Sequence, residues 1–446
     1  MKKRIACLTE YTSLLDHQGN RNETGQHAYV SEMITQLAEN GWQVDVFTCM
    51  IDPAQPKITQ INAKVRVIQI RANAAQPRVK EPDHKFIDIY CTEIEDFVSK
   101  EKVIYNLIHA NYYTVGLVAI ELKRKLKVPF VFTFHELGQV RMKNLQVEVI
   151  SEARIKIEQQ IIKKADAIVV ECPQDKADLI QYYKASSKKT FIIPYGFNPN
   201  RFFPIDRAEA RIILNLNVGD KILLQMGCIA PHRGIDNVIK SMALLDAGKQ
   251  NIRLIVLDAL NDSEDPINTD ELKRLKLLAE DLGLASQVSF DERPDVAKLQ
   301  YYYAAADLFV NTPLFDGLGI TPLEAMACGT PVIGSEVGAI KFAVVDGKTG
   351  FIIPPKAPEL LADRIKLVIK NKALLEQMSR DSVRHVYSTF TWKKVAEQMI
   401  DIYEYVLLTK GLKNQFTKAA SNKNIDRSIP LRNIYLKRNM QAKYES

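Results

Sequence analysis

Two carboxylates eight positions apart, Asp316 and Glu324, have the clearest potential for chemistry in this chain. Between them, Gly317-Leu318-Gly319 forms a glycine-rich turn that opens a helix. A helix start offers unpaired backbone N–H groups and a positive dipole end, which suit a phosphate. A carboxylate one to two turns into the helix can accept hydrogen bonds from ribose hydroxyls. The segment therefore predicts a nucleotide-sugar site, with amides at Leu318 and Gly319 for phosphate, Glu324 for ribose and Asp316 for the sugar.

A second turn with a cation runs from Gly227 to Gly234, after an apolar run and before a helical stretch. Its Arg233 can form two parallel hydrogen bonds to phosphate oxygens. We expect Gly227 and Arg233 to bind a diphosphate. The alternative is an ordinary loop with one arginine.

The first half of the chain offers a different set of polar residues. His135 follows the apolar run Phe130–Phe134, at the carboxyl end of a strand, where α/β proteins bind ligands. Gly25 and Gln26 lie in the first strand-to-helix connection, where glycine lets backbone amides approach an oxygen closely. His109 ends the preceding apolar run and is a further candidate for the same edge.

The segment from Pro322 to Ile333, PLEAMACGTPVI, resembles the donor-binding segment of retaining GT-B glycosyltransferases. The family is the large one that includes sucrose-phosphate synthase and the inositol-phosphate glycosyltransferases. Its members usually have glutamate where this chain has Asp316, whose reach is about 1.5 Å shorter, one C–C bond. They often have arginine where this chain has Cys228, whereas Arg233 stands at the position of a family lysine.

Three further strings carry the same resemblance over roughly residues 1–410. Thr24-Gly25-Gln26 is similar to a TGGQ loop with one glycine lost, and Thr133–Gly138 is similar to the family's TGHSLG. Arg154 lies in a string similar to RIxxE. Arg141, Lys143 and Arg154 are candidates for binding an acceptor phosphate, although helical Arg and Lys more often cover a solvated face.

The resemblance implies a retaining, metal-independent hexosyltransferase without a cofactor. It would use a nucleotide diphosphate sugar, with a UDP-sugar expected, and a sugar, polyol or glycan acceptor, with a phosphorylated sugar or polyol as one class. His135, Asp316 and Arg233 would be the catalytic residues. Two alternatives remain: a non-catalytic nucleotide-sugar-binding subunit, because of Cys228 and Asp316, and a nucleotide-sugar 2-epimerase.

Alternating apolar runs and amphipathic stretches predict an α/β fold of two tandem Rossmann-like domains with a cleft between them. The runs expected as strands are Ile5–Leu8, Val44–Thr48, Val65–Ile70, Leu107–Ala110, Phe130–Phe134, Ala167–Val170, Lys221–Met226, Arg253–Leu257, Gln287–Phe290, Asp307–Asn311, Pro331–Gly334 and Gly350–Ile353. Tyr29–Glu39 is expected as a helix, and residues 73–85 as a surface loop. The predicted domains are 1–195, which takes the acceptor, and 196–390, which takes the nucleotide sugar. A helix over 391–410 returns to the N-terminal domain by resemblance, and 411–446 form a basic tail.

The bulk numbers limit the class of protein. The composition, 46% hydrophobic and 25% charged in 446 residues, is that of a soluble two-domain protein. The net charge is +7, of which the tail from Gly411 carries +6. The rest is nearly neutral, which argues against a nucleic-acid partner. The tail either contacts anionic lipid, as peripheral binding at the inner face of a membrane, or is a solubilising terminus.

The six cysteines are scattered without a CxxC pair, which predicts reduced thiols, a cytoplasmic location and no zinc site. No apolar run reaches 18 residues, so no transmembrane helix is expected. The N-terminal segment MKKRIACLTE is expected as a first strand rather than a signal peptide.

Overall fold

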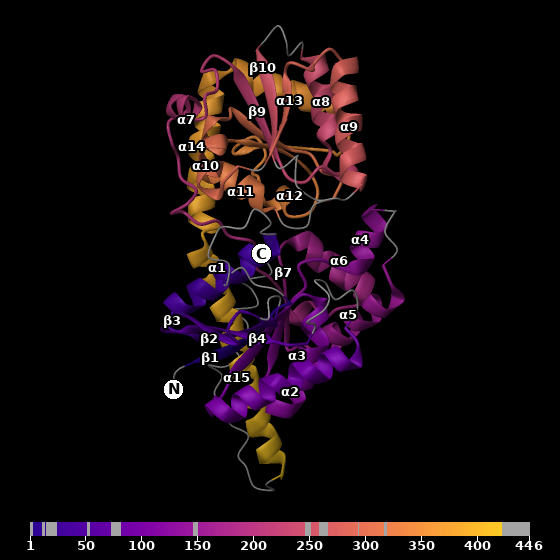
Figure 1. Cartoon of the computed structure of the whole chain (residues 1–446), viewed down its shortest axis with the longest axis vertical. Helices are drawn as coiled ribbons and strands as arrows, with labels where there is room; N and C mark the ends of the chain where they lie inside the picture. The colour runs from indigo at the N-terminus through magenta and orange to yellow at the C-terminus, as the bar shows by residue number, and fades with distance from the viewer. Residues whose placement is uncertain are drawn as a thin grey trace. The chain divides into compact units, whose positions relative to one another are not determined.

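The computed structural model describes residues 3–10, 14, 25–50, 54–72, 82–145, 150–245, 251–257, 266–292, 294–315 and 319–421. The chain forms two compact units (Figure 1). Of the described residues, unit 1 comprises those up to Pro194 together with 395–421, and unit 2 comprises those from Tyr195 to Lys394. Among the described residues, we find no helix with the length and apolar character needed to cross a bilayer.

Unit 1 is built on an eight-stranded sheet with the order β3-β4-β2-β1-β5-β6-β7-β8. All neighbouring strands are parallel except the β3–β4 pair. The strands are β1 (Arg4–Leu8), β2 (Gln43–Cys49), β3 (Ile58–Asn62), β4 (Val65–Ile70), β5 (Leu107–Asn111), β6 (Phe130–Thr133), β7 (Ala167–Val170) and β8 (Thr190–Ile192). The helices are α1 (Gly25–Glu39), α2 (His84–Glu101), α3 (Gly116–Leu126), α4 (Gly138–Leu145), α5 (Glu152–Lys164), α6 (Pro173–Tyr183) and α15 (Trp392–Ser421), with short 3-10 turns at Tyr113–Val115 and Ser187–Lys189.

Unit 2 contains a six-stranded, fully parallel sheet with the order β11-β10-β9-β12-β13-β14. Its strands are β9 (Lys221–Met226), β10 (Ile252–Leu257), β11 (Val288–Asp291), β12 (Leu308–Asn311), β13 (Val332–Ser335) and β14 (Gly350–Ile353). The helices are α7 (Arg207–Ile213), α8 (Ile235–Leu244), α9 (Pro266–Asp281), α10 (Val296–Ala305), α11 (Ile320–Ala327), α12 (Ile340–Ala343), α13 (Pro358–Lys370) and α14 (Lys372–Thr389), with a 3-10 turn at Pro231–Arg233.

Each sheet lies between layers of helices (Figure 1). Because both faces are covered, the strands are nearly continuous apolar runs, and β1, β5, β6 and β7 are buried over almost their whole length. The predicted class of two Rossmann-like α/β domains is therefore confirmed. Among the parallel strands of each sheet the order reverses once, between β1 and β5 in unit 1 and between β9 and β12 in unit 2. Ligands of such folds bind at the carboxyl ends of the strands beside this switch point.

Two strands and two helix starts differ from those that the sequence predicts. Strand β3 was missed because its residues alternate between exposed and half-buried at the sheet edge, and β8 because it has three residues. Helix α1 begins at Gly25 rather than Tyr29, since its first turn lacks apolar residues. The predicted loop 73–85 is wrong at its end: Asp83 caps α2 by accepting a hydrogen bond from the Phe86 amide at 2.7 Å. Residues 73–81 lie outside the described residues.

Candidate functional site

In unit 2, the turn after β9 and the turn after β12 are bonded to each other at the carboxyl edge of the sheet. The Thr312 hydroxyl donates to the Gly234 carbonyl at 3.1 Å, and the Leu314 amide donates to the His232 carbonyl at 2.8 Å. Gly234 has φ +69°, and a Cβ there would lie 1.9 Å from the Thr312 carbonyl oxygen. Only glycine fits this contact, which fixes the Arg233 turn against the end of β12.

The Arg233 side chain lies over Gly227, as the diphosphate prediction requires. A Cβ on Gly227 would be 3.9 Å from the guanidinium carbon, and Gly227 has φ +136°, which favours glycine. Nη2 of Arg233 is 3.8 Å from the Cys228 sulfur, and the Gln225 amide donates to the Arg233 carbonyl at 3.2 Å. The structure therefore brings the two predicted phosphate ligands of this turn together.

Glu324 lies in the second turn of α11, and its carboxylate is held by a buried tyrosine. The Tyr303 hydroxyl, from α10, donates to Oε2 of Glu324 at 2.7 Å, and Tyr303 is 1% exposed. At the start of α11, Gly319 has φ +62°, and a Cβ there would lie 2.7 Å from Cβ of Ala339. The helix start thus packs closely on the segment after β13, with Glu324 one turn further along.

Two predicted donor ligands, Asp316 and Leu318, lie outside the described residues, so their roles stay predictions. The chain on both sides is placed. Pro313 accepts a hydrogen bond from the Ser335 hydroxyl at 2.6 Å, which ties the end of β12 to β13. The carboxyl ends of β9, β12 and β13 therefore meet at one edge, with Gly227, Arg233, Gly319 and Glu324 on their turns.

In unit 1, His135 follows β6 and is enclosed by residues of three other elements. Its Nδ1 lies 3.0 Å from Oε1 of Glu171, which follows β7, and its Nε2 lies 3.2 Å from Oδ1 of Asn111, which ends β5. The Tyr29 ring of α1 packs edge-on against the imidazole at 4.9 Å. His135 is 4% exposed and has φ +61°, a left-handed backbone that is uncommon outside glycine.

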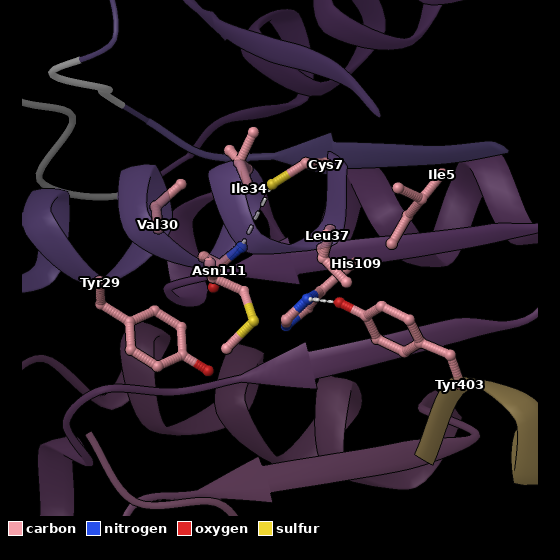
Figure 2. Close-up of a pocket in the computed structure, with 10 residues that line it drawn as sticks. Ile5, Cys7, Tyr29, Val30, Ile34, Leu37, His109, Asn111 and Tyr403 are labelled. Carbon is pink, nitrogen blue, oxygen red and sulfur yellow. Dashed lines mark hydrogen bonds between the residues drawn. The ribbon is translucent and has the colours of Figure 1, made fainter. Parts of the chain in front are cut away.

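Burial sets the protonation of the His135–Glu171 pair. It lowers the pKa of the His135 imidazole to about 3 and raises the pKa of the Glu171 carboxyl to about 8. The Asn111 amide donates to the Cys7 sulfur at 3.6 Å (Figure 2), which turns its oxygen toward Nε2 of His135. Nε2 therefore carries the ring proton, whereas the contact between Nδ1 and Oε1 of Glu171 lacks the geometry of a hydrogen bond. Near this pair, burial and then Glu171 also raise the pKa of Asp175 to about 8.

His109 does not serve as a ligand-binding residue at this edge, contrary to the sequence expectation. Its Nδ1 is 2.6 Å from the Tyr403 hydroxyl of α15, and its Nε2 is 2.9 Å from the Thr133 hydroxyl. The residue is 2% exposed and lines a small internal pocket with Cys7 and Asn111 (Figure 2). Burial lowers its pKa to about 3, so it is a neutral residue that joins the sheet to the last helix.

Five residues form an ion-pair cluster next to His135, which we call the Glu136 network: Tyr112, Glu136, Arg141, Arg154 and Glu158. Glu136 accepts from Nη1 of Arg141 at 2.9 Å, from Nη2 of Arg154 at 2.9 Å and from the Tyr112 hydroxyl at 3.0 Å. Nε of Arg154 donates to Glu158 at 3.0 Å. Both arginines predicted for an acceptor phosphate are therefore already paired with carboxylates.

The Glu136 network is anchored at its inner end. Glu158 is fully buried and also accepts from the Gly138 amide at 3.0 Å and from the Tyr183 hydroxyl. Arg154 stacks on the Tyr113 ring, with its guanidinium carbon 4.4 Å from the ring centroid. Burial alone would raise the pKa of Glu136, but Arg154 and then Arg141 hold it below its ordinary value. Glu136 is therefore ionised at neutral pH.

The predicted phosphate loop is described only in part. Gly25 and Gln26 form the first turn of α1, directly after the undescribed segment, and the description covers their backbone alone. Their role stays a prediction. Among the described residues, no group of three or more His, Cys, Asp or Glu side chains could hold a metal ion.

Comparison with known proteins assigns the chain and its fold to a family. The family model "Glycosyl transferases group 1" matches residues 206–384, and "Glycosyltransferase Family 4" matches residues 24–201. A D-inositol 3-phosphate glycosyltransferase of Corynebacterium jeikeium is 30% identical over 407 residues, covering 90% of this chain and 96% of the relative. The chain belongs to the group 1 glycosyltransferases.

Solved structures agree with this assignment of the glycosyltransferase. A sucrose-phosphate synthase from Thermosynechococcus elongatus is 28% identical with a TM-score of 0.78, and the match covers 91% of this chain and 100% of that one. An Anabaena protein solved in complex with UDP-glucose shares the fold at 18% identity, with a TM-score of 0.68 and coverage of 90% and 99%. The resemblance found in the sequence is therefore confirmed, as are the GT-B fold and glycosyltransferase activity.

Three residues of this glycosyltransferase's sites escaped sequence reasoning. Glu171 could have been found, because it directly follows the strand Ala167–Val170, at the same sheet edge as His135. Glu136 could also have been found from the sequence, because it is the charged residue next to His135. Tyr303 had no such signal: it is one tyrosine of the run Tyr301–Tyr303, and only the fold selects the one that contacts Glu324.

Proposed function

We propose that this glycosyltransferase transfers a hexose from a nucleotide diphosphate sugar to a hydroxyl of a sugar, polyol or glycan, with retention of anomeric configuration. The observation that carries the proposal is the carboxyl edge of the unit 2 sheet, where Arg233 lies against Gly227 after β9, and α11, which holds Glu324, begins after the neighbouring strand β12. A guanidinium, a helix start and an oriented carboxylate are ligands for the diphosphate and ribose of one nucleotide.

We expect the nucleotide diphosphate of the donor to be UDP. The support is indirect: the Anabaena structure of the same fold was solved with UDP-glucose. The names of the Corynebacterium relative and of the sucrose-phosphate synthase concern inositol 3-phosphate and sucrose phosphate. They favour an acceptor from the small sugars and polyols.

The chemistry assigned to unit 2 is stabilisation of the leaving diphosphate. As the bond between the anomeric carbon and the phosphate oxygen breaks, negative charge develops on the diphosphate. Arg233 and the amides at Leu318 and Gly319 would stabilise it, each good donor contributing about 3 kcal/mol. Glu324 would accept hydrogen bonds from the ribose and Asp316 from the sugar. With these fixed donors we propose that the reaction needs no metal or other cofactor.

The acceptor hydroxyl would attack from the face that the diphosphate leaves, so that no protein nucleophile is required. We assign His135 to the sugar's far side, as a residue that shapes the edge of unit 1 and stays neutral. Its low pKa and its two ring contacts argue against a role as a proton carrier. A cytoplasmic location is part of the same proposal, because nucleotide sugars are the expected substrates.

The test is a thermal-shift and calorimetric titration with UDP, GDP and ADP and their sugar conjugates, with and without a chelator. We expect one nucleotide to stabilise the protein, with the effect lost in Glu324→Ala and Arg233→Ala and kept in the exposed control Arg253→Ala. Binding to none of the nucleotides would contradict the proposal.

Product analysis then separates the alternatives. With the preferred donor and a panel of acceptors, NMR should show a product with the donor's anomeric configuration. Donor isomerisation without acceptor would mean a 2-epimerase. Binding without turnover that Cys228→Arg with Asp316→Glu converts into transfer would mean a non-catalytic subunit.

A further inference from the structure

Glu136 stands where a bound phosphate would have to stand to use the two arginines assigned to it. Its carboxylate receives three side-chain donors, from Arg141, Arg154 and Tyr112, at 2.9 to 3.0 Å. Guanidinium and phenol donors in this arrangement suit a phosphate oxygen as well as a carboxylate. The side chains of Arg141 and Glu136 are 33% and 24% exposed, so this end of the Glu136 network reaches the surface.

Replacing the Glu136 carboxylate by a phosphate would be unfavourable because of the charges in the network. Within the Glu136 network, the two arginines are balanced by Glu136 and Glu158, so that the five side chains carry no formal net charge. A phosphate ester brings a charge of about −1.5 to −2 at neutral pH. It would have to displace the Glu136 carboxylate from three hydrogen bonds or lie beside it against like-charge repulsion.

The inner end of the network limits any rearrangement. Arg154 is 7% exposed, is bonded to Glu158 through Nε, and packs on the Tyr113 ring. Its guanidinium cannot swing toward a ligand without leaving Glu158 as a buried carboxylate with one fewer donor, which is expensive. Only a change at Glu136 itself frees donors at the surface.

We propose that Glu136 is an internal substitute for an acceptor phosphate and that the acceptor of this enzyme is an unphosphorylated sugar or polyol. This inference rests on the proposed function, because it presupposes that the enzyme transfers a sugar to an acceptor. It makes Glu136 a specificity-determining residue, which excludes the phosphorylated class suggested by the names of relatives. Arg141 and Arg154 then position Glu136 and Tyr112 rather than bind substrate.

The first experiment uses inorganic phosphate as the probe, by calorimetry on the full chain without nucleotide. Wild type and Arg141→Gln should bind phosphate equally, because Arg141 is already occupied. Glu136→Gln keeps the shape and removes the charge, and should gain a binding event with at least tenfold higher affinity. Glu136→Gln with Arg141→Gln should lose that gain. Glu152→Gln, on the exposed side of α5, is the matched control and should behave as wild type.

The comparison of wild type with Arg141→Gln decides the question even if Glu136→Gln does not fold. Phosphate binding at least tenfold weaker in Arg141→Gln than in wild type would overturn the proposal. So would a folded Glu136→Gln, by circular dichroism, that gains no phosphate binding.

The second experiment compares acceptor pairs, inositol with inositol 3-phosphate and glucose with glucose 6-phosphate, in the transfer reaction. Any transfer should favour the unphosphorylated member by at least tenfold in kcat/KM, and a preference for the phosphorylated member would contradict us. The phosphate titration tests Glu136 without requiring that the protein bind a nucleotide. A chain that binds no nucleotide would sink the proposed function and leave the test of Glu136 intact.

Discussion

The carboxyl edges of the two sheets in this glycosyltransferase differ in structure: backbone contacts form one, and side-chain contacts form the other. In unit 2 the edge is a backbone construction, in which glycines with positive φ allow Arg233 and the start of α11 to pack closely. In unit 1 the edge is filled by side chains that contact one another: the His135–Glu171 pair is neutral, and the charges of the Glu136 network compensate one another. A backbone edge with a cation suits an anionic ligand, whereas a compensated edge suits a neutral one.

The two edges should therefore differ in the amino-acid substitutions that they tolerate. Backbone sites fail when a Cβ is added, even though no charge changes. Compensated side-chain sites fail when one charge is removed, even though the shape is kept.

Arg154→Ala should have the largest effect. It leaves Glu136 and Glu158 without their shared cation in a buried environment, so we expect a loss of about 3–5 kcal/mol in the free energy of unfolding. The measurement is denaturant unfolding by circular dichroism. Lys156→Ala, on the same helix in an exposed pair, should change it by less than about 0.5 kcal/mol. Equal effects of the two variants would refute the compensation argument.

Gly234→Ala should destabilise unit 2 by about 3 kcal/mol, combining a left-handed backbone with a clash against the Thr312 carbonyl. Gly283→Ala is the matched control, since Gly283 has the same φ of +69° with nothing within 4 Å. It should cost about 1 kcal/mol, from the backbone alone. Thermal unfolding and nucleotide titration measure the difference, and two variants with the same loss would show that the contact with Thr312 is unimportant.

Glu171→Gln should change how stability depends on pH. The pKa of Glu171 and of Asp175 is raised to about 8 in the fold, so each contributes stability that is complete below its ordinary pKa, 4.5 for Glu171 and 3.8 for Asp175, and is lost as pH rises toward 8. His109 and His135, with pKa lowered to about 3, contribute in the opposite sense up to pH 6.5. The net decline should therefore appear between pH 6.5 and 8, at up to about 1.4 kcal/mol per pH unit for each carboxyl.

The readout is the free energy of unfolding from denaturant titrations at several pH values in this window. Glu171→Gln should remove one carboxyl's share of the slope, whereas the control Glu152→Gln should leave it unchanged. A slope that Glu171→Gln does not alter would rule out a proton held by Glu171.

Tyr303→Phe should have the smallest effect and acts on ligand binding. It removes the hydroxyl that orients Glu324 and keeps the ring that packs on Phe202 and Phe309. On the proposed function, nucleotide affinity should fall about tenfold, the loss of one hydrogen bond to a charged group. Calorimetry with UDP and 3′-deoxy-UDP measures it: the penalty should shrink for the deoxy analogue. Tyr301→Phe, on the same helix, should bind both as wild type does.

The sequence predicted the strands of both sheets well because parallel strands buried on both faces are continuous apolar runs. It failed where that signal is weak, as at the edge strand β3 and the three-residue β8. Among site residues, Gly227 and Arg233 were placed together because a glycine turn and a cation are both visible in sequence. The pairing of Arg154 with Glu136 was not, since only folding brings α5 and the end of β6 together, whereas Arg154 and Glu158 lie one turn apart on α5.

The bond between His109 and Tyr403 has a consequence for the order in which the chain folds during synthesis. Tyr403, Ile402 and Met399 of α15 are fully buried in unit 1, so the core of that unit is incomplete until the ribosome has released residues from the far end of the chain. The described residues of unit 2 form a single stretch from Tyr195 to Lys394, so the core of this unit is complete earlier. The usual order of folding, in which the N-terminal domain folds first, is reversed here: unit 1 emerges first from the ribosome but completes its core last.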